Sequence, residues 1–172
     1  IDKDLWTVPG AKYDFKRGLV LDLNFNDTNS DGTGVFDAAG NLFGAFQSGA
    51  DINGTGADKS RAGFFDGVDD FVDLGANLVQ DLSAVTISAW VKSYVSSKGS
   101  DEYIVENVGG GSTHSAYLTW RSNEQYYFYV HNGTTGANAQ HGTAYADTDW
   151  HYVVGVYDGT NVLVYVDGVV GT

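Results

Sequence analysis

Residues 149–172 read DWHYVVGVYDGTNVLVYVDGVVGT and predict two long strands joined by a tight turn. The dipeptide Asp158-Gly159 lies between two runs rich in Val and Tyr, and Asp-Gly readily adopts the positive φ angles that hairpin turns need. Apolar side chains occupy both faces of the second run, Val162–Val166. We therefore expect a hairpin whose second strand lies inside a sheet and not at its edge.

Short segments elsewhere in the chain alternate apolar and polar residues, which is typical of strands. They span residues 18–26, 42–47, 62–75 (two short strands around Asp66-Gly67), 86–95, 103–105, 117–120 and 126–130, with loops at 27–40, 51–61 and 133–141. No segment has the sustained period of 3.6 residues that a long helix shows. These observations predict an all-β fold, an antiparallel two-sheet β-sandwich or jelly roll over residues 18–172. Residues 1–17 are expected to form an N-terminal extension or an edge strand.

Acidic residues dominate the charge of the chain. Asp and Glu number 22 against 9 Lys and Arg, for a net charge of −13, which disfavours nucleic acid and anionic membranes as partners. No apolar run approaches the roughly 20 residues needed to cross a bilayer, so we expect no membrane insertion. Cysteine is absent, which excludes disulfides, thiolate nucleophiles and Cys-based zinc sites. The start at Ile1 and the absence of Met indicate a processed protein or an excised fragment.

Three segments, in this order and spacing, resemble the laminin-G-like jelly roll of the concanavalin-A-like lectin and glucanase superfamily. They read AGFFDGVDDFVDLG (62–75), VTISAWVK (85–92) and DWHYVVGVYDGTNVLVYVDGV (149–169), and GLVLDLNF with DAAGN (18–25 and 37–41) resembles the family's opening strand and turn. In that family further strands follow the last Asp-Gly turn, so the resemblance implies that the C-terminal strands are missing here. We expect a strand-donating chain, a cleaved C-terminal fragment or residues 1–15 to complete the sheet.

The loop that follows residue 26 contains half of a calcium-binding pattern. It spells D-x-N-x-D-G, in which oxygen side chains at alternate positions converge on one cation. The candidate ligands are Asp27, Asn29, Asp31 and the backbone carbonyl of Thr33. The alternative is an ordinary loop whose side chains cap their own backbone. The resemblance adds Asp37 and Asn41, since family members bind a structural calcium near this turn.

Trp120 and its neighbours suit a sugar site, because pyranoses present both apolar C–H patches and hydroxyls. Trp120 ends a predicted strand next to Arg121 and close to the run YYFYV. The candidate ligand-binding residues are Trp120, Arg121, Tyr126 and Tyr127. The alternative for Trp120 is a buried strand aromatic, and the resemblance implies that Trp90 and Trp150 belong to the core.

Catalytic residues are not expected. Glu102 and Glu106 share a face of one predicted strand, but their separation is more than twice the distance of about 5 Å that a retaining glycosidase requires. The Glu-x-Asp-x-x-Glu order of the superfamily's glucanases is absent, and the four histidines are scattered.

The sequence thus predicts a secreted or cell-surface, non-catalytic module that binds a glycan or an extracellular protein and is stabilised by calcium. One alternative is a structural subunit of an extracellular fibre or adhesin whose sheet another chain completes. A second alternative is a glycoside hydrolase or lyase, since one fold hosts all three functions.

Overall fold

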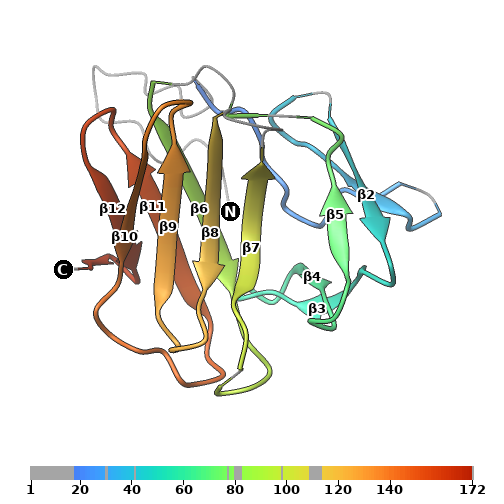
Figure 1. The fold of residues 1–172 in the computed structure, drawn as a ribbon. Coiled ribbons are helices and arrows are strands. Elements are labelled where there is room, and N and C mark those ends of the chain that lie inside the picture. The colour runs from blue at the N-terminus through green and yellow to red at the C-terminus, as the bar shows by residue number, and fades with distance from the viewer. Residues whose placement is uncertain are drawn as a thin grey trace, which may run out of the picture. The chain divides into compact units, whose positions relative to one another are not determined.

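The computed structural model describes residues 18–29, 31–40, 42–76, 78–79, 83–97, 99–108 and 114–171. These residues form antiparallel strands and connecting loops, without a helix in the described part of the chain (Figure 1). Among them no helix is long and apolar enough to cross a membrane. The strands are β1 (Gly34–Phe36), β2 (Phe43–Gln47), β3 (Asp51–Thr55), β4 (Arg61–Phe64), β5 (Phe71–Asp73), β6 (Val85–Val91), β7 (Glu102–Val108), β8 (Ser115–Trp120), β9 (Tyr126–His131), β10 (Gly136–Gln140), β11 (His151–Tyr157), β12 (Val162–Val166) and β13 (Val169–Val170).

The chain forms two compact units, which are residues 1–55 with 60–74, and residues 56–59 with 75–172. The predicted extension or edge strand at residues 1–17 lies outside the described residues. That residues 18–172 form one β-sandwich domain stays a prediction.

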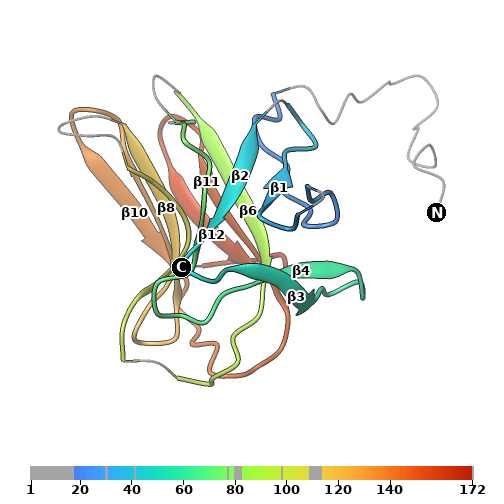
Figure 2. The same cartoon turned by 90° about the vertical axis from the view of Figure 1, so that its right-hand side faces the viewer.

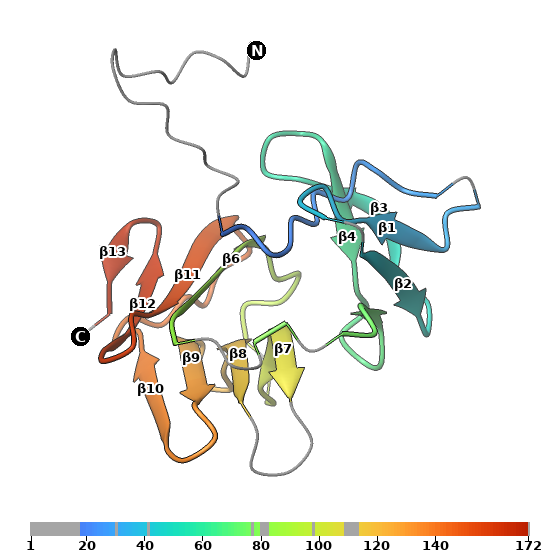
Figure 3. The same ribbon diagram turned by 90° about the horizontal axis from the view of Figure 1, so that it is seen from above.

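The larger unit is a sandwich of two four-stranded sheets, with strand orders β13-β12-β11-β6 and β10-β9-β8-β7. Figures 2 and 3 show the two sheets lying face to face. Alternate residues of each strand point into the layer between them and exclude water from it. The buried residues of this core are Val79, Ala116, Leu118, Trp120, Tyr126, Phe128, Val130, Val153, Val164 and Val166. The predicted antiparallel two-sheet sandwich is confirmed.

Phe128 and Gly155 bring the two sheets close together. The Phe128 side chain of β9 is fully buried, and a Cβ atom at Gly155 of β11 would lie 2.3 Å from a carbon of its ring. Because any side chain at Gly155 would overlap the ring, glycine is the residue that allows this packing.

The C-terminal hairpin forms as predicted. β11 and β12 pair antiparallel, and the Asp158 amide donates to the Asn161 carbonyl at 3.2 Å. The Asp158 carboxylate also accepts hydrogen bonds from the backbone amides of Thr160 and Asn161, at 2.8 and 2.7 Å. β12 lies between β11 and β13, which confirms its interior position. Its valines Val164 and Val166 are fully buried, whereas the opposite face is only half-buried.

The smaller unit contains a sheet in the order β1-β2-β5 and a two-stranded ribbon of β3 and β4. Both strands predicted around Asp66-Gly67 exist, as β4 and β5, but each pairs with a different partner. The loops predicted at 27–40, 51–61 and 133–141 are wrong in part, because β1, β3 and β10 lie within them. Neither DINGT nor GANAQ is rich in β-branched residues, and backbone pairing with β4 and β9 makes them strands despite low intrinsic propensity.

The strand predicted at residues 18–26 is also wrong, because the structure is irregular there. The Asn24 side chain accepts hydrogen bonds from the amides of Asn26 and Asp27, at 2.9 and 3.4 Å. Phe25 has a φ of 58°, which a strand cannot accommodate. Local side chain to backbone bonds therefore replace the ladder that the alternating pattern predicted.

Two tryptophans differ from prediction in their burial. Trp120 is only 6% exposed and lies in the core, whereas Trp90, predicted to be core, is 57% exposed. Trp90 occupies an outward position of β6, where it pairs with Tyr152 with ring centroids 5.2 Å apart. Trp150 is half-buried. Alternation identified the two faces of each strand but not which of them meets the opposite sheet.

Truncation of the two tryptophans is expected to have unequal effects on stability. Trp120→Ala should lower the free energy of unfolding by about 3–5 kcal/mol, because it removes a buried aromatic ring. Trp90→Ala should cost about 1 kcal/mol or less, since its ring is largely in solvent and packs on the Tyr152 ring. Urea unfolding of both variants measures the difference, and equal losses would contradict this assignment of core and surface.

Candidate functional site

Tyrosine side chains line up on the outer face of the sheet β10-β9-β8-β7, whose strands lie side by side in Figure 1. Tyr127 and Tyr129 of β9 alternate with buried residues and therefore point outward. The register places Tyr129 opposite Tyr117 of β8, and Tyr103 of β7 lies one row away, opposite Thr119. We call Tyr103, Tyr117, Tyr127 and Tyr129, together with Arg121, the tyrosine face.

The rings of the tyrosine face pack against one another. Tyr117 stacks on Tyr129 with ring centroids 4.9 Å apart and on Tyr127 at 6.0 Å, and the Tyr103 ring meets it edge to face at 5.4 Å. Side chains stand roughly perpendicular to a sheet, so the stacked rings present their edges on the outer side of the sheet. The face thus combines aromatic C–H edges with hydrogen-bonding groups.

Arg121 is held at the end of this row by three side chains. Its guanidinium carbon lies 4.8 Å from the centroid of the Tyr127 ring. Its Nε donates to Asp101 at 3.3 Å, and its Nη1 donates to Gln140 at 3.5 Å. Asp101 also accepts the Ser122 amide at 2.9 Å. This hydrogen bond, and then the charge of Arg121, hold the pKa of Asp101 below its usual value.

The hydroxyl group of Tyr117, at the centre of the row, is a neutral donor and acceptor at physiological pH. Burial raises the pKa of Tyr117 to about 12, with further contributions from Tyr127, Tyr103 and Tyr129. A Cβ atom at Gly136 of β10 would lie 2.2 Å from the Tyr129 hydroxyl oxygen. This glycine therefore leaves room for the hydroxyl beside β10. Tyr117 can therefore bind ligand hydroxyls without placing a tyrosinate charge next to them.

The predicted ligand-binding residues divide between the two faces of the sheet. Arg121 and Tyr127 lie on the tyrosine face, whereas Trp120 and Tyr126 are 6% and 5% exposed and point into the core. These two rings do not offer a face to a ligand, which corrects the sequence-based assignment. Sequence reasoning missed Tyr103 and Tyr117, which join the face only through strand pairing.

The D-x-N-x-D-G loop bonds mainly to itself. Asn29 donates to the Thr33 hydroxyl at 2.8 Å, and this hydroxyl donates to Asp31 at 2.9 Å. Asn29 also accepts the Gly34 amide at 3.0 Å, and Asp27 accepts the Asn24 side-chain amide at 3.1 Å. These bonds correspond to the alternative interpretation, a loop whose side chains cap their own backbone.

Asp37 differs from the residues of that loop. It is 6% exposed, and its Oδ1 accepts the amides of Asp22 and Ala39, at 2.8 and 2.9 Å. Its buried Oδ2 has no hydrogen-bond partner among the described residues. Leaving such a carboxylate oxygen unpaired is costly, so Asp37 fits a cation ligand. Asn41, predicted beside it, lies outside the described residues.

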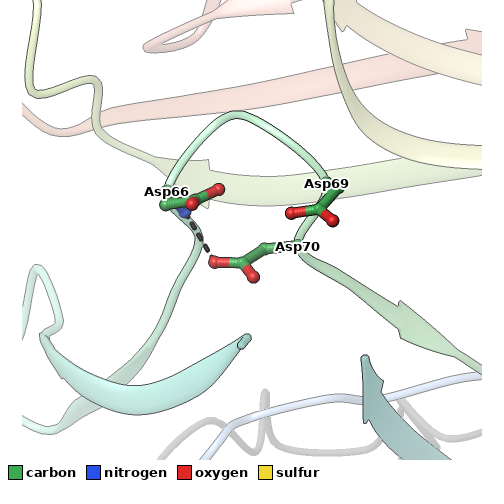
Figure 4. A group of neighbouring side chains, drawn as sticks. All are labelled: Asp66, Asp69 and Asp70. Carbon is green, nitrogen blue, oxygen red and sulfur yellow. Dashed lines mark hydrogen bonds between the residues drawn. The ribbon is translucent and has the colours of Figure 1, made fainter. Parts of the chain in front are cut away.

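A second acidic group, which sequence reasoning missed, lies in the loop between β4 and β5 (Figure 4). One carboxylate oxygen from each of Asp66, Asp69 and Asp70 lies within 4.8 Å of the others. The Asp66 amide donates to Asp70 at 2.8 Å, while Asp66 and Asp69 are exposed. Oxygen ligands of this kind suit a hard divalent cation. The sequence signal that could have revealed this group is the run D-x-x-D-D, which contains a Gly that favours a turn.

His151 joins two segments that are distant in sequence. Its Nδ1 lies 2.8 Å from Asp167 and its Nε2 lies 2.9 Å from Asp147. Asp167 also accepts the Tyr152 amide at 2.9 Å. Burial works against the charged imidazole, but the hydrogen bonds to Asp167 and Asp147 outweigh it, so the pKa of His151 is raised. The sequence showed only scattered histidines, because Asp167 approaches His151 through the pairing of β11 with β12.

Stability is expected to depend on pH through His151. The contribution of its charged form is complete below about pH 6.5, the unperturbed histidine value, and is lost as the pH rises through the raised pKa. The lowered pKa values of Asp147 and Asp167 add stability that is lost as the pH falls from about 3.9 through those values. Urea unfolding between pH 6 and 9 measures the decrease in the free energy of unfolding that is expected as His151 loses its proton. His151→Gln should make this decrease smaller, and an unchanged dependence on pH in that variant would contradict the assignment.

Most of the sequence similarity to a known protein family lies in the larger unit. The laminin-G-like family model described as concanavalin A-like lectin/glucanases superfamily matches residues 66–171, which include β5 to β13. The crystal structure of an S-layer domain-containing protein (residues 221–444) from Clostridium thermocellum ATCC 27405 is similar in fold. The two chains are 19% identical in sequence and superpose with a TM-score of 0.57. The alignment covers 88% of this chain and 70% of that chain. No curated protein sequence matches. Because the family match covers more than half of the chain and both sheets of the sandwich, this protein belongs to the concanavalin A-like lectin/glucanases superfamily, among its laminin-G-like domains.

Proposed function

We propose that the chain is a non-catalytic, secreted or cell-surface module that binds carbohydrate through the tyrosine face. The observation that carries this proposal is the row of aromatic edges and neutral hydroxyls beside Arg121 and Gln140. A pyranose ring offers apolar C–H groups and hydroxyls in alternation, so it matches a surface that mixes both kinds of group. The name of the superfamily, which includes lectins, and that of the S-layer domain-containing neighbour agree with an extracellular role.

The placement of Glu102 and Glu106 favours a binding module over a glucanase. Sequence reasoning put both on one face of β7, but a bulge between Tyr103 and Val105 shifts the register. Glu102 pairs with inward-facing Trp120, whereas Glu106 pairs with outward-facing Tyr117. Directly paired residues share a face of the sheet, so the two carboxylates lie on opposite faces. They cannot flank one glycosidic bond as the acid and the nucleophile of a retaining enzyme do.

Substitutions on the tyrosine face are expected to weaken glycan binding without unfolding the sandwich. Tyr127→Ala and Arg121→Ala should each lower the affinity at least tenfold, about 1.4 kcal/mol, because each removes a side chain that belongs to the proposed contact. A glycan array identifies the ligand, and isothermal titration calorimetry then measures each variant.

Tyr152→Ala is the matched control for these substitutions. Tyr152 is an exposed tyrosine on the other sheet, so its removal should leave glycan affinity unchanged. Equal losses in Tyr152→Ala and Tyr127→Ala would remove the tyrosine face as the site. An array without any bound glycan would remove the proposed function itself.

We also propose that calcium stabilises the fold, with Asp37 as the ligand that fits best. Its buried, unpaired Oδ2 supports this choice, and a cation there would offset the cost of burying the carboxylate. Asn29 and Asp31 already accept hydrogen bonds within their own loop, and the Thr33 carbonyl accepts the Phe46 amide at 2.9 Å. These oxygens therefore lack the unmet need for a partner that distinguishes Asp37 Oδ2.

Calcium is expected to raise the melting temperature over that in excess chelator. An ion a hundredfold above its dissociation constant adds about 2.7 kcal/mol to the free energy of unfolding. Asp37→Asn should abolish the increase while keeping an oxygen that accepts the Asp22 and Ala39 amides, and Asp31→Asn should retain it. If calcium fails to raise the melting temperature of Asp69→Asn but still raises that of Asp37→Asn, the ion binds instead at the acidic group of Figure 4. No increase in the unsubstituted protein would refute the proposal.

A further inference from the structure

The tyrosine face carries a negative charge that forms no ion pair with any residue the structure describes. Glu106 of β7 is exposed, and its register partner Tyr117 is the tyrosine at the centre of the row. The carboxylate of Glu106 therefore projects from the same face as the rings. A ligand lying along Tyr117 and Tyr129 would pass beside this charge.

The positive charge of Arg121 does not balance Glu106, because it already has a partner. Asp101 receives the hydrogen bond from Nε at 3.3 Å, and the Gln140 carbonyl and the Tyr127 ring occupy two further sides of the guanidinium. Arg121 and Asp101 together contribute no net charge to the face. Tyr117 contributes none either, since burial raises the pKa of its hydroxyl to about 12.

Long-range electrostatics act in the same direction. The whole chain carries a net charge of −13, which repels polyanions before contact. This repulsion is screened over about 8 Å at physiological ionic strength. Selection at contact therefore depends on the charges of the face itself, where Arg121 is paired with Asp101 and Glu106 remains.

We propose, building on the proposed glycan-binding function, that the tyrosine face selects neutral glycans over glycans with carboxylate or sulfate groups, and that Glu106 determines this specificity. The neutral hydroxyls and paired Arg121 bind ligand hydroxyls, while Glu106 disfavours an anionic substituent on the same sugar chain.

The test uses an array on which each neutral oligosaccharide is printed beside its C6-oxidised, uronic-acid counterpart. The two members share linkage and length and differ in charge. The unsubstituted protein is expected to bind the neutral member at least tenfold more tightly in 50 mM NaCl, and the gap should narrow in 500 mM NaCl as salt screens the repulsion. Glu106→Gln should raise affinity for the oxidised member about three- to tenfold and leave the neutral member unchanged.

Glu102→Gln is the matched control, because it removes the same charge from the same strand but from the side of inward-facing Trp120. Its binding to both members should equal that of the unsubstituted protein. If both substitutions raise affinity for the oxidised member equally, the effect is one of overall charge and the role of Glu106 is overturned.

The two remaining outcomes separate this inference from the proposed function. If the unsubstituted protein binds the oxidised member as tightly as the neutral one, neutral selectivity is overturned while glycan binding at the tyrosine face stands. If neither member of any pair binds, the proposed function fails and this inference fails with it.

Discussion

Burial of the layer between the two sheets is the constraint on which the other features depend. The fully buried ring of Phe128 packs against the backbone of Gly155, and no side chain at position 155 would allow the same separation. Because residues in a strand alternate between faces, burying Phe128 also sends Tyr127 and Tyr129 to the outside. A shift of register by one residue would exchange the core and the tyrosine face. The proposed ligand surface is therefore a consequence of the core.

The bulge in β7 decides which side chains that strand contributes. It adds a residue between Tyr103 and Val105 relative to β8, so Tyr103 and Glu106 both face outward although they are an odd number of positions apart. Bulges change the direction in which side chains point. In this sheet the bulge adds an aromatic ring and a negative charge to one face, and it places Glu102 on the other. The same irregularity therefore separates the two carboxylates and gives the face its charge.

The acidic composition has a structural role in the turns of the larger unit. Asp101, Asp158 and Asp167 each accept a backbone amide, from Ser122, Thr160 and Tyr152 respectively. Carboxylates satisfy amide donors at bends where no strand partner is available. His151 adds a cationic link between Asp147 and Asp167 where like charges would otherwise approach each other. Asp37, in the smaller unit, differs because one of its buried oxygens remains unpaired.

By itself the sequence determined the features that depend on neighbouring residues. Asp158-Gly159 between two Val-rich runs specified the C-terminal hairpin, because turn geometry and alternation are local properties. The mixture of aromatic and polar residues after Trp120 also singled out Arg121 and Tyr127, which lie on the tyrosine face. Only the tertiary structure decided which face of a strand is buried, since alternation treats both faces alike. It placed Trp120 inside and Trp90 outside, and it brought Tyr103 to Tyr117 and Asp167 to His151 through pairings that no short window of sequence contains.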